Sequence, residues 1–309
     1  MRRLAPACLA LAAALLGCSS GSGSGEGGGP AGAAEKPAAS GDRAAAQPVS
    51  YTSRLPIARY SYTETENAAI EYAQQLLTQR CLKSYGIAYE PEKPDQGSAE
   101  SADRRYGVSN PTEAALFGYH PNPDSLRDDQ VDLPKEALPV FYGNRSAAPG
   151  SGDEIRYKGK RVPDAGCFGQ SVGKLSKEYD APDAAAVASR IATGSYDESL
   201  ADPAVKEVFR KWSSCMRKAG FRYASPNEPV NKSEFQGDTI SAKEKKTAVA
   251  DVRCKEATGL LDIWFKAESA IQKTKVRENA EALEKLSAAH RKKAAAARRI
   301  VAGDEGAAK

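Results

Sequence analysis

The side chains best suited to chemistry in this 309-residue sequence are its six cysteines and two histidines. Thiolates and imidazoles bind zinc when they are closely spaced, with roughly two to four residues between paired cysteines. No Cys-x-x-Cys occurs here, and His120 and His290 lie far along the chain from any cysteine. We therefore expect no metal site and no cofactor, and we expect the cysteines to serve other chemistry.

Cys18 is the first cysteine with a readable role. It follows Leu15-Leu16-Gly17, after an Arg2-Arg3 pair and an apolar segment that is too short to span a membrane. This stretch resembles the lipobox of bacterial lipoproteins, in which the thiol receives a diacylglycerol group and becomes the mature N-terminus. Leu16 departs from that motif, which usually has a smaller or polar residue there. The resemblance implies a signal peptide at 1–17 and lipidation at Cys18.

The later cysteines are an even number in a chain expected to be exported, which favours disulfide bonds over free thiols. Counting alone allows three pairings of the four. These cysteines are Cys81, Cys167, Cys215 and Cys254.

Two segments that start at a cysteine resemble each other. The segments 81–89 and 215–223 share the order Cys, apolar, basic, two residues, Gly, apolar, one residue, Tyr. An Asp-x-x-Cys follows each of them, ending at Cys167 and at Cys254. Order and spacing predict a duplicated unit with Cys81–Cys167 and Cys215–Cys254 disulfides. Coincidence is the alternative, because glycine often follows the end of a helix.

Each of these segments closes a predicted helix. A capping box at Thr63 to Glu66 predicts the start of the first helix, which ends at Gly86. Asp202-Pro203 predicts the start of the second, which ends at Gly220. The apolar faces are Ile70, Ala73, Leu77 and Cys81 in the first helix, and Val205, Val208, Phe209, Trp212, Cys215, Met216 and Ala219 in the second.

The remaining elements complete a mainly α fold. We expect a disulfide-stapled helical body of two related units, with an irregular Pro/Gly-rich insert and a long C-terminal helix. The insert, 90–165, is expected to hold a short helix at 111–118 and a hairpin around Gly159. From 241 to about 302 no proline occurs, so one helix or two in line are expected there, packed on the body up to about Leu286.

The expected organisation has five parts. A signal peptide at 1–17 precedes the lipidated cysteine and a flexible Gly/Ser/Ala/Pro tether at 18–48. The first helical unit with its insert covers 49–182, and the second with the long helix covers 183–302. A tail, 303–309, ends the chain.

Candidate catalytic groups are few, and each has a simpler explanation. His120 could act as a general base, but a surface-loop histidine is commoner. His290 sits in a polar segment and is expected to be solvated. The acidic pairs Glu64 with Glu66 and Asp128 with Asp129 could serve a glycan hydrolase. Helix-start and loop positions explain these acids better, so we expect no catalytic residue.

Charge and tyrosines offer binding surfaces instead. Residues 241–302 carry 15 Lys and Arg against 8 Asp and Glu, whereas residues 18–240 carry 26 against 30. The basic tail 291–299 could touch anionic lipid headgroups or phosphate-bearing wall polymers, or it could be a solvated helix end. Tyrosines of the insert could contact a partner, although packing is the simpler account. They are Tyr106, Tyr119, Tyr142 and Tyr157.

Lipobox, tether and cysteine pattern together resemble secreted lipoproteins of actinobacteria. The resemblance implies a chain anchored by lipid on the extracytoplasmic face of the cell membrane, and either a Gram-positive or a Gram-negative membrane is compatible with it. We expect a non-enzymatic binding or accessory component of a cell-envelope system. Its partners would be the bilayer, through acylated Cys18, and an envelope protein or wall polymer, but no nucleic acid. The alternatives are a solute-binding lipoprotein of a transporter and a cell-wall glycan hydrolase.

Overall fold

The computed structural model describes residues 50–93, 103–123, 131–144, 154–177 and 179–307, with side chains up to 304. The expected signal peptide at 1–17, Cys18 with its tether, and the acids Asp128 and Asp129 lie outside the described residues. The described residues belong to one compact unit.

The described residues form ten α-helices, several short 3-10 turns and one two-stranded hairpin, so the predicted mainly α fold is confirmed. The helices are α1 (Glu64–Lys83), α2 (Pro111–Phe117), α3 (Leu138–Tyr142), α4 (Gly166–Ser176), α5 (Pro182–Ser199), α6 (Pro203–Lys218), α7 (Asn227–Val230), α8 (Ala242–Thr258), α9 (Leu260–Glu278) and α10 (Ala280–Ala307). The strands are β1 (Arg156–Tyr157) and β2 (Lys160–Arg161), and the 3-10 turns are η1 (Thr52–Arg54), η2 (Pro56–Tyr60), η4 (Lys135–Ala137) and η5 (Ser233–Phe235). None of the described helices is long and apolar enough to cross a membrane.

The starts of α1 and α6 follow from their capping residues. Thr63 accepts a hydrogen bond from the Glu66 backbone N–H at 3.2 Å, and Glu66 accepts one from the Thr63 backbone N–H, as a capping box requires. Asp202 accepts from the backbone N–H of Ala204 at 2.7 Å, just before Pro203 in the first turn of α6. Both predicted helix starts are confirmed.

The ends of α1 and α6 adopt the same local structure. Gly86 and Gly220 have φ angles of 71° and 90°, a region that glycine enters without steric cost. In each case the next residue reaches back five positions, and its N–H donates to a helix carbonyl: Ile87 to Leu82 at 3.1 Å, Phe221 to Met216 at 2.8 Å. This is the Schellman arrangement. The resemblance of the two segments in sequence therefore corresponds to one shared backbone motif.

Two disulfides staple these helices to partners. Cys81–Cys167 joins α1 to α4 with a Cα–Cα distance of 5.5 Å, and Cys215–Cys254 joins α6 to α8 at 5.7 Å. These are the pairs that the sequence analysis expects. The likeness stops there, because Cys167 lies in the first turn of α4 and Cys254 in the last turns of α8.

The C-terminal segment is not one long helix or two in line, which corrects that expectation. Gly259, with a left-handed φ of 63°, separates α8 from α9, and Asn279 separates α9 from α10. Packing also continues past Leu286, because Ala294 and Ala297 of α10 are fully buried. The last helix runs on to Ala307, beyond the predicted end near 302.

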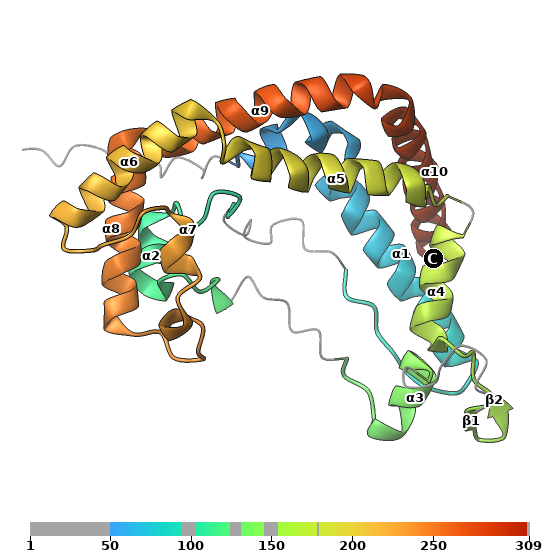
Figure 1. Ribbon diagram of the computed structural model, residues 1–309. Helices are drawn as coiled ribbons and strands as arrows, with labels where there is room; N and C mark the ends of the chain where they lie inside the picture. Colours follow the sequence, from blue (N-terminus) through green and yellow to red (C-terminus); the bar gives the residue numbers. More distant parts are fainter. Residues whose placement is uncertain (1–49, 94–102, 124–130, 145–153, 178, 308–309) are drawn as a thin grey trace, which may run out of the picture. The chain divides into compact units, whose positions relative to one another are not determined.

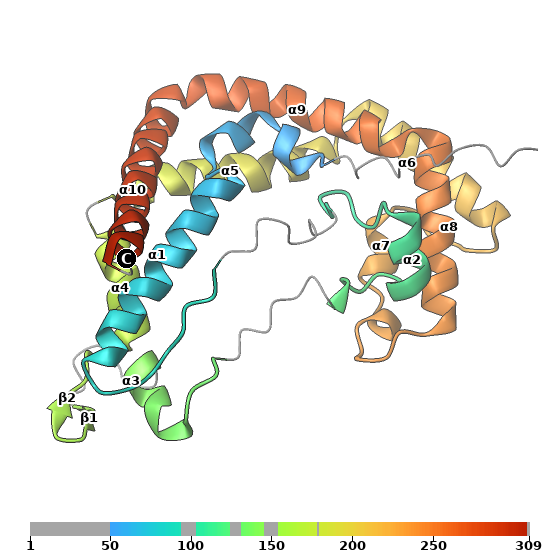
Figure 2. The same cartoon turned by 180° about the vertical axis from the view of Figure 1, so that it is seen from behind.

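Helices far apart in sequence pack side by side. Helix α1 lies along α10 and α4, and α5 lies along α9. Helix α2, from the insert, packs on α8, which also contacts α6 (Figures 1 and 2). Elements of the expected first unit, 49–182, thus pack directly on elements of the expected second unit, 183–302.

The insert contains the two short elements that the sequence predicts. Helix α2 begins after Asn110, whose side chain accepts from the backbone N–H groups of the first turn, and it ends at Gly118. In the hairpin, Lys158 and Gly159 both have positive φ, the requirement of a tight two-residue turn between antiparallel strands. Both predictions are confirmed.

Candidate functional site: a basic groove beside the second disulfide

An open groove with a volume of about 720 Å³ lies where α6, α8 and α2 meet. Helix α8 contributes one face to it, because Lys245, Val249 and Arg253 repeat every four residues and so lie on one side of the helix. The remaining lining residues are Ala115 of α2, Cys215, Lys218, Ala219 and Phe221 from α6 and the turn after it, and Lys246, Ala250 and Cys254 of α8.

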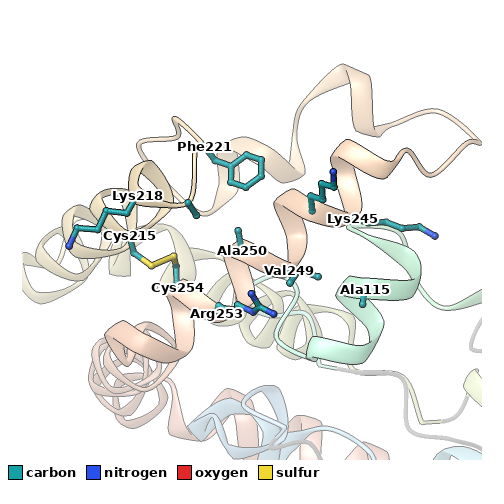
Figure 3. A pocket seen from close by; sticks show the side chains of 11 residues that line it. Ala115, Cys215, Lys218, Phe221, Lys245, Val249, Ala250, Arg253 and Cys254 are labelled. Carbon is teal, nitrogen blue, oxygen red and sulfur yellow. A yellow bond between two sulfur atoms is a disulfide. The ribbon is translucent and has the colours of Figure 1, made fainter. Parts of the chain in front are cut away.

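The centre of the groove is apolar and its edges are basic. Figure 3 shows the Phe221 ring beside Ala250, with the Cys215–Cys254 disulfide on one side and Val249 on the other. Two lysines, Lys218 and Lys245, lie at opposite ends in this view. No aspartate or glutamate is among the lining residues.

The four cations of the groove are Lys218, Lys245, Lys246 and Arg253. Within the described part of the chain, none of them forms an ion pair or a side-chain hydrogen bond. Their neighbours on α8 behave differently: Lys243 pairs with Glu234 at 2.8 Å, and Lys255 pairs with Asp251 at 3.0 Å. The positive charge is therefore left uncompensated on the groove side of α8 in particular.

The opposite face of α8 is held by buried charges. Glu244 is fully buried, and its Oε1 accepts from the backbone N–H of Tyr119 at 2.9 Å and lies 2.8 Å from His120 Nδ1. The chain approaches so closely here that a Cβ on Gly118 would lie 2.5 Å from Glu244 Oε1. These contacts fix the end of α2 against the start of α8.

A buried ion pair fixes the other half of α8. Asp251 accepts from Trp212 Nε1 of α6 at 2.9 Å, and the Lys255 ammonium donates to the Val108 carbonyl at 2.9 Å. Both charged side chains are almost completely buried. Burial raises the pKa of the Asp251 carboxyl, and the Lys255 charge opposes that rise. Helices α6 and α8, the two walls of the groove, are thus linked by a polar contact as well as by the disulfide.

His120 connects Glu244 of α8 to the backbone at Gly237. Its Nδ1 faces Glu244 and its Nε2 lies 2.9 Å from the Gly237 carbonyl oxygen, so both neighbours are acceptors. Both nitrogens can donate only in the protonated ring. The hydrogen bond to Glu244 is the main cause that raises the pKa of His120. A ring held in this way has no free nitrogen to act as a general base.

The other predicted site residues are placed as follows. Glu66 belongs to the capping box of α1, and Glu64 lies in the same first turn, as expected for helix-start acids. The expectation that His290 is solvated is wrong: its Nδ1 lies 3.0 Å from the Tyr60 carbonyl oxygen, and its ring stacks on Tyr62. Burial lowers the pKa of His290.

Two tyrosines of the insert serve packing. Tyr106 and Tyr119 are buried. The Tyr106 hydroxyl donates to buried Glu268 at 2.7 Å, and Ser195 and Gln272 donate to the same carboxylate. The simpler account of these two tyrosines is therefore the better one.

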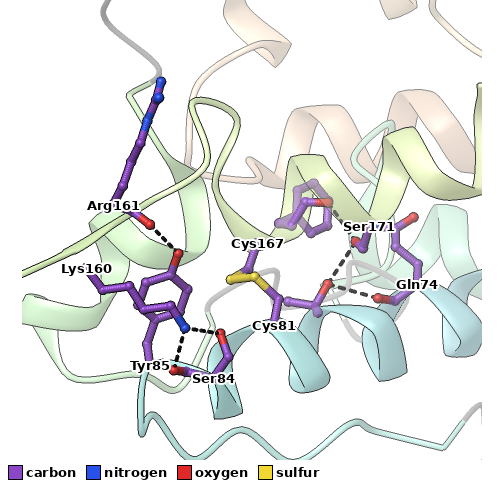
Figure 4. Close-up of a disulfide and its surroundings, with 10 residues drawn as sticks. Gln74, Cys81, Ser84, Tyr85, Lys160, Arg161, Cys167 and Ser171 are labelled. Carbon is purple, nitrogen blue, oxygen red and sulfur yellow. Dashed lines mark hydrogen bonds between the residues drawn. A yellow bond between two sulfur atoms is a disulfide. The ribbon is translucent and has the colours of Figure 1, made fainter. Parts of the chain in front are cut away.

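At the first disulfide, the position equivalent to the groove is covered by a tyrosine and by the hairpin. In the shared segment, Tyr85 corresponds to Ala219, and its hydroxyl donates to the Arg161 carbonyl of β2 at 2.6 Å (Figure 4). Lys160, from the same hairpin, donates to the Ser84 carbonyl at the end of α1 at 2.9 Å. Tyr85 is thus half-buried and bonded to the hairpin at the end of α1, whereas Ala219 is exposed at the end of α6.

Sequence reasoning located the basic segment but not the groove. It placed the interacting cations in the tail, where Lys293 bonds Ser176, and Lys292 and Arg298 are exposed. The signal in the sequence was the four-residue spacing of Lys245, Val249 and Arg253 on a helix that carries Cys254. Among the described residues no cluster of three His, Cys, Asp or Glu side chains could hold a metal ion.

Comparisons with protein families, with curated proteins and with solved structures found no match for this chain. The groove and its uncompensated charge are therefore the features from which a function is inferred.

Proposed function

We propose that this chain is a lipid-anchored lipoprotein on the extracytoplasmic face of the cell membrane, which acts as a non-enzymatic binding component of a cell-envelope system. The groove beside Cys215–Cys254 carries the proposal, since four cations that have no partner among the described residues surround an apolar floor. Such a surface favours a negatively charged component by electrostatic complementarity. We assign the binding role to this groove rather than to the tyrosines of the insert, because Tyr106 and Tyr119 are buried.

The anchor and tether set what the groove can reach. Acylation of Cys18 would hold the chain on the bilayer, and the Gly/Ser/Ala/Pro composition of 18–48 predicts a root-mean-square span of roughly 30 Å. The body would then work close to the membrane. Phosphate-bearing lipids and wall polymers are the negatively charged components at that distance.

Two alternatives receive less support. A glycan hydrolase needs convergent catalytic groups in a cleft, yet Glu66 is engaged in a helix cap and both His120 nitrogens have partners. A two-lobed solute-binding protein is expected to alternate strands and helices, and the described residues contain a single short hairpin. Neither alternative has an observation of its own that favours it.

The binding role can be tested with the complete mature chain carrying Cys18→Ser, which removes only the lipid. Calorimetric titrations would use three negatively charged probes: polyphosphate, a polyglutamate peptide and an alkyl phosphate. We expect at least one of them to bind, and the double variant Lys245→Gln with Arg253→Gln to weaken that binding about tenfold, because two exposed charge pairs contribute roughly 1 to 2 kcal/mol together.

The matched control is the double variant Lys206→Gln with Arg299→Gln, which removes the same charges from exposed positions outside the groove. It should leave binding unchanged. Absence of binding by every probe, or equal weakening by the two double variants, would contradict the role assigned to the groove.

The anchor is tested separately by mass spectrometry of the membrane-extracted native chain. A diacylglyceryl mass on an N-terminal Cys18 peptide is expected. An unmodified Cys18, or a chain that starts before it, would refute the lipid anchor and leave the groove experiment unaffected.

A further inference from the structure

We infer that the groove binds an anionic amphiphile of a single alkyl chain, with the chain on the apolar floor and the charged headgroup among the cations of α8. This inference rests on the proposed function and names the ligand class for the same site.

The size of the groove suits a small molecule. Its volume of about 720 Å³ falls within the range of ligand sites, roughly 300 to 1,000 Å³. An amphiphile with one alkyl chain is a ligand of that size, whereas stable protein partners bury surfaces of 20 or so residues on each side.

The lining restricts the chemistry of the occupant. Apart from the four cations, it consists of alanine, valine, phenylalanine and the disulfide, without any serine, threonine, asparagine or glutamine side chain. Most backbone groups of α6 and α8 are bonded within their helices, and the last carbonyls of α6 can only accept hydrogen bonds. An extended peptide or a sugar would lose hydration of its N–H or O–H donors here, which is costly, because no lining side chain offers an oxygen acceptor. An alkyl chain with a negative headgroup needs only what the groove offers.

The apolar floor is left open by specific residues. Ala219 stands where the first segment has Tyr85, so no ring fills the space at the end of α6. The hairpin that reaches Ser84 through Lys160 has no counterpart among the described residues next to Lys218. The Phe221 ring and Ala250 are both half-buried and line the open groove, and Figure 3 shows them beside each other.

The inference predicts how affinity depends on the two ends of the ligand. Titrations of the mature Cys18→Ser chain would compare octyl phosphate and decyl phosphate, below their micelle concentrations, with inorganic phosphate and with uncharged decyl maltoside. Each added methylene should tighten binding by about two- to fourfold if it contacts the floor. Inorganic phosphate should not bind measurably, and decyl maltoside should bind about tenfold more weakly than decyl phosphate.

A variant that copies the first segment tests the position of the chain. Ala219→Tyr places a ring at the end of α6, as Tyr85 does at the end of α1, and should abolish decyl phosphate binding while the charges remain. Ala257→Tyr, at an exposed position of α8 outside the groove, is the matched control and should bind normally. Circular dichroism and thermal unfolding would verify that both variants fold. If Ala219→Tyr does not fold, the Lys245→Gln with Arg253→Gln variant remains, with an expected tenfold loss.

The outcomes separate this inference from the proposed function. Binding of polyphosphate or polyglutamate at the groove, without binding of alkyl phosphates, would overturn the ligand class and leave the binding role intact. Affinity that is independent of chain length, or unchanged in Ala219→Tyr, would also overturn the ligand class. Failure of every negatively charged probe would overturn both.

Discussion

The surroundings of the two disulfides show how one local motif is used in two ways. Cys81 and Cys215 both precede a Schellman helix end with glycine at positive φ. At the first, Tyr85 and the hairpin close the helix end. At the second, Ala219 leaves the end open, and the facing helix α8 presents cations there. The cysteine motif forms the same corner twice. The residue just before its glycine differs: Tyr85 is found at the covered corner and Ala219 at the open one.

The helices that complete the two corners also differ. Helix α4 packs through apolar residues such as Leu175, which is almost fully buried. Helix α8 is anchored through Glu244, Asp251 and Lys255, all buried. Because one set of charged residues on α8 faces inward and another set lines the groove, this helix is polar on two faces, and its apolar content alone gives little sign of how it packs.

The largest expected effect is the loss of either disulfide. In the chain-entropy account, loops of 86 and 39 residues predict about 4 to 5 kcal/mol for each bridge, slightly more for the first. Urea unfolding of the Cys81→Ala with Cys167→Ala variant and of the Cys215→Ala with Cys254→Ala variant would measure both. A difference of several kcal/mol between them would show that one of the two corners is held mainly by other contacts.

The buried ion pair behind the groove gives the next effect. Lys255→Met leaves the Asp251 carboxylate buried without its cation and should cost about 3 to 5 kcal/mol in free energy of unfolding. The double variant Asp251→Leu with Lys255→Met should recover a large part of that loss, because it leaves no unpaired charge. If the double variant is less stable than Lys255→Met alone, the Trp212 hydrogen bond to Asp251 matters more than the pair.

A smaller effect distinguishes two glycines with positive φ. Gly118→Ala brings a Cβ against Glu244 and should cost about 3 kcal/mol or less. Gly220→Ala meets nothing within 4 Å, so only backbone strain of about 1 kcal/mol is expected. Chemical denaturation of the two variants would measure both losses, and equal losses would contradict the close approach of α2 to Glu244.

The smallest effect concerns pH and the two histidines. The pKa of His120 is raised, so its contribution to stability is present below about pH 6.5, the ordinary value, and is lost as pH rises through the raised pKa. The pKa of His290 is lowered, so its contribution is present above that pH and is lost as pH falls through the lowered pKa. The free energies of unfolding of His120→Gln and His290→Gln, measured between about pH 5 and 8, should therefore show opposite trends relative to the unsubstituted chain.

How far the sequence predicts the fold depends on the kind of signal. Caps and glycine stops are local, so α1, α6, α2 and the hairpin could be predicted from Thr63, Asp202, Pro111 and Gly159. Helices α4 and α5 were not predicted individually, because small residues dominate them and their burial depends on α1, α9 and α10. The breaks at Gly259 and Asn279 were missed because the surrounding residues all favour helix.

The groove could not be predicted because it depends on tertiary packing. The apolar residues Ala250, Cys254 and Ala257 recur at helical spacing on α8, but Ala257 is exposed and Ala250 lines the groove. The buried face instead carries Glu244, Asp251 and Lys255, which are charged residues that no apolar pattern selects. Their partners come from residues 108–120 and from α6, which sequence spacing does not place.

The most direct test of the account is methyl NMR of the mature Cys18→Ser chain during titration with decyl phosphate. Val249 lines the groove at the second disulfide, and Val172 is exposed on α4, five residues after Cys167 of the first. The account predicts that the Val249 methyl signals shift and saturate, while those of Val172 stay unchanged. Shifts of equal size at both valines, or at Val172 alone, would contradict a binding groove specific to the Cys215–Cys254 corner.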